Sequence, residues 1–179
     1  MNQQQIDDVA YQRSQAEEIL ANTQSSEDKA RAHVNLGIAC EHERNWEAAI
    51  EHYTQALANH PEDRQVHYLG NNNKAFSLIQ MKRFDEAEEY CEAAIKVDPD
   101  RHNAHKNLAL VYQGQGRWLD AAFSFATAYR NNPRDPRAWQ FLSQLLSARP
   151  DLLVQSESLR QEIDSLRQMI DGGGCTLSN

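Results

Sequence analysis

The sequence has few of the residues that interrupt secondary structure or cross-link a chain. Its 179 residues include 7 glycines, 5 prolines and 3 cysteines, and β-branched residues are scarce. Hydrophobic residues make up 40% of the chain and charged residues 25%, which is the balance of a folded protein rather than a disordered one. The abundant residues Ala, Gln, Glu, Leu and Arg are good helix formers, so a folded, helix-rich chain is expected.

Other absences argue against several classes of protein. The sequence holds no run of eighteen apolar residues, so no membrane-spanning helix is expected. The first eight residues have neither a basic start nor an apolar run, which is unlike a secretory signal. Cys40, Cys91 and Cys175 are odd in number and form no CxxC pair, which predicts neither a disulfide framework nor a zinc site. We therefore expect a cytoplasmic location.

The sequence also has fewer basic residues than acidic ones. The chain has 18 Lys and Arg against 26 Asp and Glu, a formal net charge of −8, which argues against nucleic-acid binding because that depends on neutralising phosphates. His102 and His105 are spaced to share a helix face, but two ligands without a convergent Cys, Asp or Glu predict no metal site. No Gly-rich phosphate loop, nucleophile elbow or paired-carboxylate motif occurs, so neither a cofactor nor catalytic residues are predicted.

What the sequence does contain is an internal repeat. Four anchor residues are separated by 38, 34 and 34 positions, and a small residue follows four positions after each anchor. In three copies an aromatic residue follows the anchor at thirteen positions, alanines at sixteen and twenty-three, and a proline at twenty-eight. The anchors are His33, Asn71, His105 and Trp139; the small residues are Gly37, Ala75, Ala109 and Ser143; the aromatics are Trp46, Phe84 and Trp118; the prolines are Pro61, Pro99 and Pro133.

Each copy predicts two antiparallel helices. Apolar residues recur at helical spacing in two blocks that a short polar segment separates. The small residues belong where helix axes cross closely, and each proline ends the second helix because it disfavours helical geometry in the residue before it. One helix pair cannot bury its apolar face alone, so the pairs are expected to stack.

The pattern resembles the tetratricopeptide repeat. Leu36-Gly37, Trp46-Glu47-Ala48-Ala49 and Asn59-His60-Pro61 match it closely, and the resemblance covers residues 30–148. It implies an all-α fold, a right-handed α-α superhelix of helix-turn-helix repeats with flanking helices at both ends. Lys74 departs from the pattern, since Leu is usual there. Four extra residues around 63–66 predict a first helix of the second repeat that begins one turn early.

The expected organisation has four parts. An N-terminal flanking helix lies within 1–25, and Ser25 to Asp28 resembles a capping box that opens the next helix. The repeat domain covers 26–148, with repeats at about 30–63, 68–101 and 102–135 and a half-repeat at 136–148. A C-terminal helix covers 149–171, and the glycine-led segment 172–179, which holds Cys175, is expected to be a flexible tail. The seam Leu159, Ile163, Leu166 and Ile170 favours a capping helix, with a short coiled-coil dimer as the alternative.

The resemblance places a binding surface on the concave side, lined by the first helix of each pair. In-register Asn35, Asn73 and Asn107 could contact a peptide backbone, or could simply be family consensus. Val34, Ile38, Leu69 and Phe76 suggest an apolar end, unless the register makes them core. The predicted partner-binding residues are Asn35, Ile38, Asn72, Asn73, Phe76, Lys106, Asn107, Leu110, Arg137 and Gln140.

Some members of this family grip acidic chaperone tails with a carboxylate clamp, which this sequence matches poorly. The better of two alignments gives two of five positions, Asn107 and Arg137, so a chaperone-tail adaptor is disfavoured. Arg101, Lys106 and Arg137 could still form a basic spot for an acidic segment, or could pair with nearby acidic residues.

The sequence therefore predicts a protein-binding adaptor, not an enzyme, that captures a peptide or partner helix. It is expected to be a monomer or weak homodimer with no nucleic-acid or membrane partner. One alternative is a structural or self-associating protein whose groove is filled by the flanking helices, and another is a secretion-type chaperone.

Overall fold

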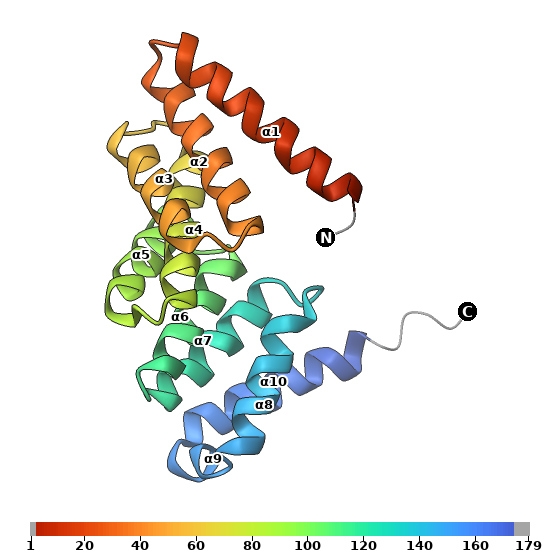
Figure 1. Cartoon of the computed structure of the whole chain (residues 1–179). Coiled ribbons are helices and arrows are strands. Elements are labelled where there is room, and N and C mark those ends of the chain that lie inside the picture. The colour runs from red at the N-terminus through yellow and green to blue at the C-terminus, as the bar shows by residue number, and fades with distance from the viewer. Residues whose placement is uncertain (1–2, 174–179) are drawn as a thin grey trace, which may run out of the picture. The chain divides into compact units, whose positions relative to one another are not determined.

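The computed structural model describes residues 3–173, which form ten α-helices (Figure 1). The described residues fall into two compact units that divide after Pro99. The predicted all-α fold of packed helix pairs is confirmed. Among the described residues, no helix combines the length and the apolar character needed to span a membrane. Unit 1 contains α1 (Gln3–Asn22), α2 (Ser26–His42), α3 (Trp46–Ala58), α4 (Arg64–Gln80) and α5 (Phe84–Val97). Unit 2 contains α6 (His102–Gly114), α7 (Trp118–Asn131), α8 (Pro136–Ala148), α9 (Asp151–Gln155) and α10 (Glu157–Gly173).

In unit 1, α2 pairs with α3, α4 pairs with α5, and α1 packs on α2. The close crossing of α2 and α3 requires a glycine. A Cβ added at Gly37 would lie 2.5 Å from Cε1 of Tyr53, whose fully buried ring fills the space beside the glycine backbone. At this repeat position the first copy is therefore restricted to glycine by the aromatic ring of the paired helix.

The turn inside each helix pair has the same backbone conformation. Arg44, Lys82 and Gly116 all have positive φ, at 59°, 58° and 77°, and each stands eleven positions after its anchor residue. Only glycine adopts this left-handed conformation without a steric penalty, so the first two turns carry a small strain that the third avoids. The backbone therefore repeats even where the residue type does not.

The helix starts follow local capping. Ser25 caps α2 by accepting a hydrogen bond from the backbone N–H of Asp28 at 3.2 Å, and Asp63 caps α4 by accepting one from Gln65 at 2.7 Å. α4 has 17 residues and α6 has 13, and α4 begins seven positions before its anchor against three for α6. Relative to its anchor, α4 therefore begins about one turn earlier than α6, as expected, and at the same offset as α2, which begins seven positions before His33.

Unit 2 is built around one apolar cluster to which α7, α8, α9 and α10 contribute. The segment expected to form one helix over 149–171 forms two, because Ser156 interrupts it and caps α10 by accepting from the backbone N–H of Leu159 at 3.1 Å. α10 extends to Gly173, two residues into the predicted tail. Its buried residues Leu159, Ile163 and Leu166 join the cluster, whereas Ile170 is 37% exposed. Residues 174–179, including Cys175, lie outside the described residues.

Candidate functional site

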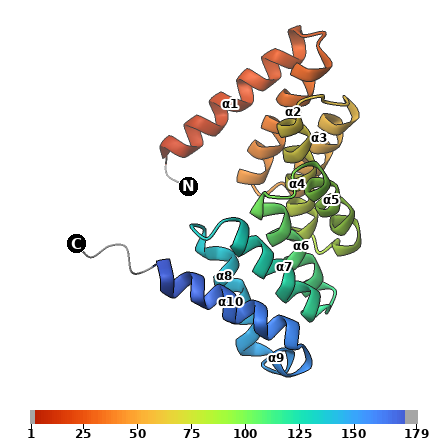
Figure 2. The same cartoon turned by 180° about the vertical axis from the view of Figure 1, so that it is seen from behind.

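In unit 1 the first helices of the two repeats, α2 and α4, contact each other (Figure 1 and Figure 2). Residues of both helices and of the loop before α4 line a pocket. The pocket has a volume of about 280 Å³. Its floor is apolar because Val34 and Val66, 3% and 6% exposed, belong to one buried cluster there, and half-buried Leu69 packs against that cluster. Its rim is polar and consists of Arg31, Asn35, Asp63 and Gln65. An apolar floor with a polar rim suits one hydrophobic side chain on a peptide whose backbone meets the rim.

A short ion-pair network holds the N-terminal end of this pocket in place. Arg31 lies between two carboxylates, with Nη2 2.9 Å from Asp63 Oδ2 and Nε 3.4 Å from Glu27 Oε1. Glu27 Oε2 also accepts a hydrogen bond from the backbone N–H of Glu62 at 3.0 Å. These contacts join the start of α2 to the loop before α4, so the inserted residues shape the pocket. A second hollow, of about 340 Å³, adjoins it through the shared residues Arg31 and Asp63.

Further along α2 and α4, the seam between them becomes polar. Glu41 accepts a hydrogen bond from Ser77 Oγ at 3.0 Å. Burial raises the pKa of the Glu41 carboxyl to about 7, although the hydrogen bond from Ser77 opposes the shift. Burial, and next the Glu41 carboxylate, raise the pKa of the neighbouring Tyr53. Glu41 was absent from the residues predicted from sequence, although it follows Val34 by seven positions and so shares its helix face.

Lys74, which replaces the usual leucine, is buried in the same unit. It is 7% exposed, and its ammonium donates to Thr54 Oγ1 at 2.7 Å and to the Tyr90 hydroxyl at 2.8 Å. The ammonium also lies 4.1 Å from the centroid of the Tyr90 ring. Its two hydroxyl acceptors come from α3 and α5, so the substitution ties together helices of two repeats.

The predicted binding residues of unit 1 lie in different environments. Asn35 is exposed at the pocket rim, Ile38 packs against the cluster that contains Val34 and Val66, and Asn72 is only 8% exposed. Asn72 donates to Asn73 Oδ1 at 2.9 Å. Phe76 packs edge-to-face on Trp46, with ring centroids 5.9 Å apart. The structure therefore brings Asn35 to the pocket, while Ile38 and Phe76 also serve the packing of the helices.

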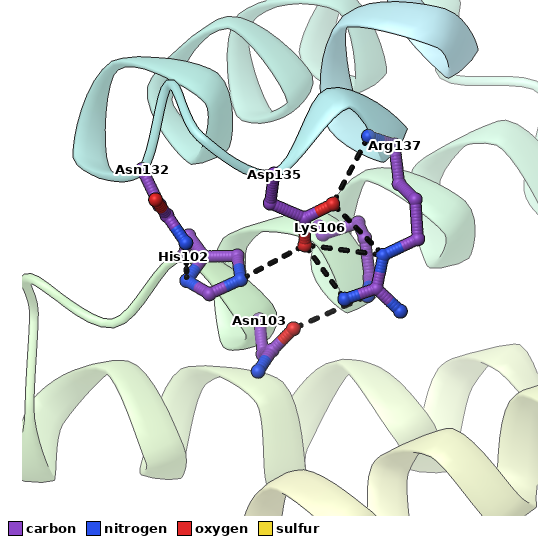
Figure 3. A network of polar contacts seen from close by, with 6 residues as sticks. All are labelled: His102, Asn103, Lys106, Asn132, Asp135 and Arg137. Carbon is purple, nitrogen blue, oxygen red and sulfur yellow. Dashed lines mark hydrogen bonds and ion pairs between the residues drawn. The ribbon is translucent and has the colours of Figure 1, made fainter.

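In unit 2, Asp135 is the centre of a polar network (Figure 3). It caps α8, and its carboxylate binds the Arg137 guanidinium through Nε at 2.9 Å and Nη2 at 2.6 Å. His102 Nε2 lies 3.1 Å from Asp135 Oδ2, and Asn132 lies 3.5 Å from the other ring nitrogen. The Arg137 side chain holds the pKa of Asp135 well below its usual range.

The remaining predicted residues belong to unit 2. Lys106 donates to Asn103 Oδ1 at 3.2 Å, and burial, followed by the nearby Arg137 charge, lowers its pKa. Arg137 and Gln140 are exposed, whereas Asn107 is 3% exposed and Leu110 packs against the apolar cluster. Lys106 and Arg137 thus meet around Asp135, which neutralises part of the predicted basic spot.

Within the described part of the chain, no three His, Cys, Asp or Glu side chains gather as they would around a metal ion. His102 is engaged by Asp135 and Asn132 in the network described above. A second histidine contact lies in unit 1, where His33 and His52 place their Nδ1 atoms 3.2 Å apart. Burial is the main cause that lowers the pKa of both rings, which fits a neutral, hydrogen-bonded pair.

Comparison with known proteins decides the family. Tetratricopeptide-repeat family models match residues 30–63 and 78–148, together more than half of the chain. The chain belongs to the tetratricopeptide-repeat family. Its repeats form a protein–protein interaction domain, as the family resemblance of the sequence predicted.

Individual relatives are distant. Rat (Rattus norvegicus) sperm-associated antigen 1 is 26% identical over 134 residues, which are 73% of this chain and only 14% of that protein. The second tetratricopeptide domain of human RPAP3, solved with the HSP70 peptide SGPTIEEVD, has a TM-score of 0.61 at 24% identity, over 67% of this chain and 97% of that one. MamA from Desulfovibrio magneticus RS-1 has a TM-score of 0.63 at 17% identity, over 90% and 97%. At these sequence identities, the structural similarity shows a shared fold and nothing more specific.

Proposed function

We propose that this protein is an adaptor that binds a segment of a partner protein along α2 and α4 of unit 1. The observation that carries the proposal is the pocket with a floor of Val34, Val66 and Leu69 and a rim of polar side chains. A stable fold does not need an open apolar hollow at this place, because a larger side chain would fill it. The amides of Asn35 and Gln65 at the rim offer donors and acceptors to a peptide backbone of any sequence.

The remaining residues predicted from sequence extend this proposal. Asn73 and Phe76 continue the inner face of α4 beyond the pocket, and we propose them as further contacts of the same partner segment. In unit 2 the exposed side chains Arg137 and Gln140 are proposed contacts, with Lys106 beside them. Asn72, Asn107 and Leu110 are mostly enclosed by their own unit, and we propose that they hold the surface in shape.

A substitution that fills the pocket tests the proposal. Asn35 is exposed, so Asn35→Trp places an indole over the apolar floor without burying a polar group in the core. Gln55→Trp is the matched control, because Gln55 is an exposed amide of α3 outside the pocket. Partners captured by the intact chain and quantified by mass spectrometry should be retained by Gln55→Trp and reduced about tenfold by Asn35→Trp, a loss on the scale of one interface hot spot. Equal capture by the two variants would show that the pocket is not the binding surface.

Binding of an acidic chaperone tail is the second candidate, because a solved relative holds the HSP70 peptide SGPTIEEVD. Asn107 and Arg137 still match two clamp positions, but Asp135 engages the Arg137 guanidinium and Asn107 is buried. Titration of the intact chain with SGPTIEEVD decides between the candidates. The proposal expects weak binding that Asn35→Trp does not change, whereas tight binding that Arg137→Ala abolishes would favour the chaperone tail.

Self-association remains the structural alternative. α10 buries Leu159, Ile163 and Leu166 in its own unit, and Met169 and Ile170 of the same helix, 43% and 37% exposed, remain available to a second copy. Light scattering at several concentrations measures the assembly. A dimer that Ile170→Asp dissociates would support this alternative, and a monomer at all concentrations would remove it.

A further inference from the structure

The seam between α2 and α4 carries opposite chemistry at its two ends. At the N-terminal end lies the pocket, where half-buried Leu69 offers apolar surface to a side chain above the buried Val34 and Val66. A family clamp that began in this repeat would need Lys at the position of Val34 and Asn at that of Ile38. The apolar residues that replace them cannot hold a carboxylate, so this end favours an uncharged side chain.

At the C-terminal end of the seam lies Glu41, a partly exposed carboxylate on the same face of α2 as Val34. Ser77 Oγ donates to one of its oxygens, and the hydroxyl of Tyr53 lies close by on α3. In the part of the chain that the structure describes, the basic side chains that form ion pairs meet other carboxylates, and no cation contributes to the electrostatics of Glu41. A carboxylate that accepts one hydrogen bond from a serine hydroxyl can still accept a cationic donor.

The residues of unit 1 around this seam carry a net negative charge, the same sign as the Glu41 carboxylate. Residues 1–99 hold 18 of the 26 acidic residues and 9 of the 18 basic ones, a formal net charge of −9, whereas residues 100–179 hold 8 and 9, a net charge of +1. The hollow beside the pocket adds Glu27, Glu62 and Asp63 against Arg31. A segment that approaches unit 1 therefore meets a negative field, which attracts basic partners and repels acidic ones.

We propose that this seam binds a partner segment that carries an apolar side chain, placed in the pocket, and a Lys or Arg side chain, placed on Glu41. Val34 and Glu41 are seven residues apart on one helix, which is about 10 Å at 1.5 Å per residue. An extended peptide covers that distance in about three residues, so the apolar and basic residues should be spaced i, i+3. The inference rests on the proposed function, since it names the chemistry of the segment that unit 1 binds.

Binding of a cation to Glu41 should be linked to a proton. A paired cation favours the ionised carboxylate, so binding lowers the pKa of Glu41 from its value of about 7 in the free protein and releases a proton at neutral pH. The groups beside the carboxylate are Ser77 on α4 and Tyr53 on α3, and neither changes charge between pH 6 and pH 8. Affinity for the basic segment should therefore rise about tenfold between pH 6 and pH 8.

A randomised twelve-residue peptide library displayed on phage, selected on the intact chain at pH 7.5, tests the proposal. Selection should enrich peptides with an apolar residue and a Lys or Arg three positions before or after it. The neutral isostere Glu41→Gln keeps the acceptor for Ser77, and it should retain the apolar preference and lose the basic one. Glu47→Gln, which removes an exposed carboxylate at the start of α3, should enrich the same peptides as the wild type.

Calorimetry on the wild-type chain with one selected, histidine-free peptide gives a measurement that does not depend on how the variants fold. The apparent binding enthalpy of the wild-type chain in buffers of different ionisation enthalpy should report the released proton. In a separate titration, Glu41→Gln should weaken binding of the same peptide about tenfold at pH 8. Enrichment without a basic residue, or a basic preference unchanged in Glu41→Gln, would overturn the inference while the peptide-binding function stands. No enrichment over the bare support would overturn both.

Discussion

The two units are built from the same repeat but keep their polar groups in different places. Unit 1 buries Asn71, Asn72, Lys74 and Ser77 inside its helix packing and carries the whole acidic excess of the chain. Among its described residues, unit 2 buries Asn107 and Ser156 but no charged side chain, and its polar network around Asp135 lies at the N-termini of α6 and α8, outside the apolar cluster. Most of the largest fully buried side chains also belong to unit 2, namely Val111, Phe125, Leu142, Leu152, Leu159, Ile163 and Leu166.

This difference in the placement of polar groups fits two different tasks, stability in unit 2 and binding in unit 1, for units built from the same repeat. An apolar core contributes stability that varies little with pH, because it holds no group that changes charge. Buried polar groups contribute less to stability and depend on their partners, and natural proteins tend to tolerate them where a function needs them. The polar interior of unit 1 lies beside the proposed binding seam, and the apolar interior of unit 2 is closed by α10.

The largest effect is expected in the core of unit 2. Ile163 on α10 is 1% exposed and packs in the apolar cluster, so Ile163→Ala should lower the free energy of unfolding by about 3 kcal/mol through lost burial and the cavity left behind. Ile170→Ala, at a 37% exposed position of the same helix, is the control and should cost under about 1 kcal/mol. Hydrogen exchange read helix by helix should show the loss in α7 to α10. An equal loss of protection in α2 to α5 would mean that the contrast between the units does not extend to their stability.

The repeat made much of the fold predictable from the sequence. A small residue at the place of Gly37, the aromatic residues and the prolines recur at fixed spacing because each fills one place in a helix pair. The helix pairs were therefore predictable from the residues, and the family from the resemblance of their pattern to a known repeat. The break at Ser156 was not predicted, because the apolar spacing on both sides fits one continuous helix and a serine is neutral enough to lie inside it. Local hydrogen bonding, which periodicity does not show, ends α9 there.

The candidate site was predictable only in outline. The inner face of α2 and α4 followed from the family resemblance, but the pocket depends on the contacts of Glu27 and Arg31 with the loop before α4, which no spacing encodes. The in-register asparagines occupy the same place in their repeats but differ in burial, since Asn35 is exposed and Asn107 is only 3% exposed. The exposure of a repeated residue depends on which neighbours cover it, and that is a property of the packed structure.

An intermediate effect, with a definite pH dependence, is expected at Glu41. Its pKa in the folded chain is about 7, above the ordinary 4.5, so the folded state holds a proton that the unfolded state releases between these values. The stability contributed by the protonated carboxyl is complete below pH 4.5 and is lost as the pH rises through 7. Glu41→Gln should therefore change stability little at pH 5 and should raise it by about 2 kcal/mol at pH 8, a figure reduced from the full shift because the carboxyl is partly exposed.

Urea denaturation at the two pH values, with hydrogen exchange in α2 to α4 as the local measurement, checks this expectation. Glu47→Gln is the control for the removal of one negative charge from an acidic unit. If Glu41→Gln stabilises the chain equally at pH 5 and pH 8, the carboxyl is not protonated in the folded protein near neutral pH.

The smallest effect is expected at Lys74, where the sequence departs from its own repeat. A buried ammonium loses hydration that its contacts only partly replace, so an apolar residue of similar size is often as stable. Lys74→Leu, which restores the usual residue, should change the free energy of unfolding by less than about 1 kcal/mol. Tyr90→Phe keeps the ring beneath the ammonium but removes one of its two hydroxyl acceptors, and it should cost more, about 1–2 kcal/mol, because the charge stays buried with fewer partners. The test is which variant loses more free energy of unfolding. A larger loss in Lys74→Leu would show that the lysine stabilises unit 1, and that the polar interior of this unit is not retained for function at the expense of stability.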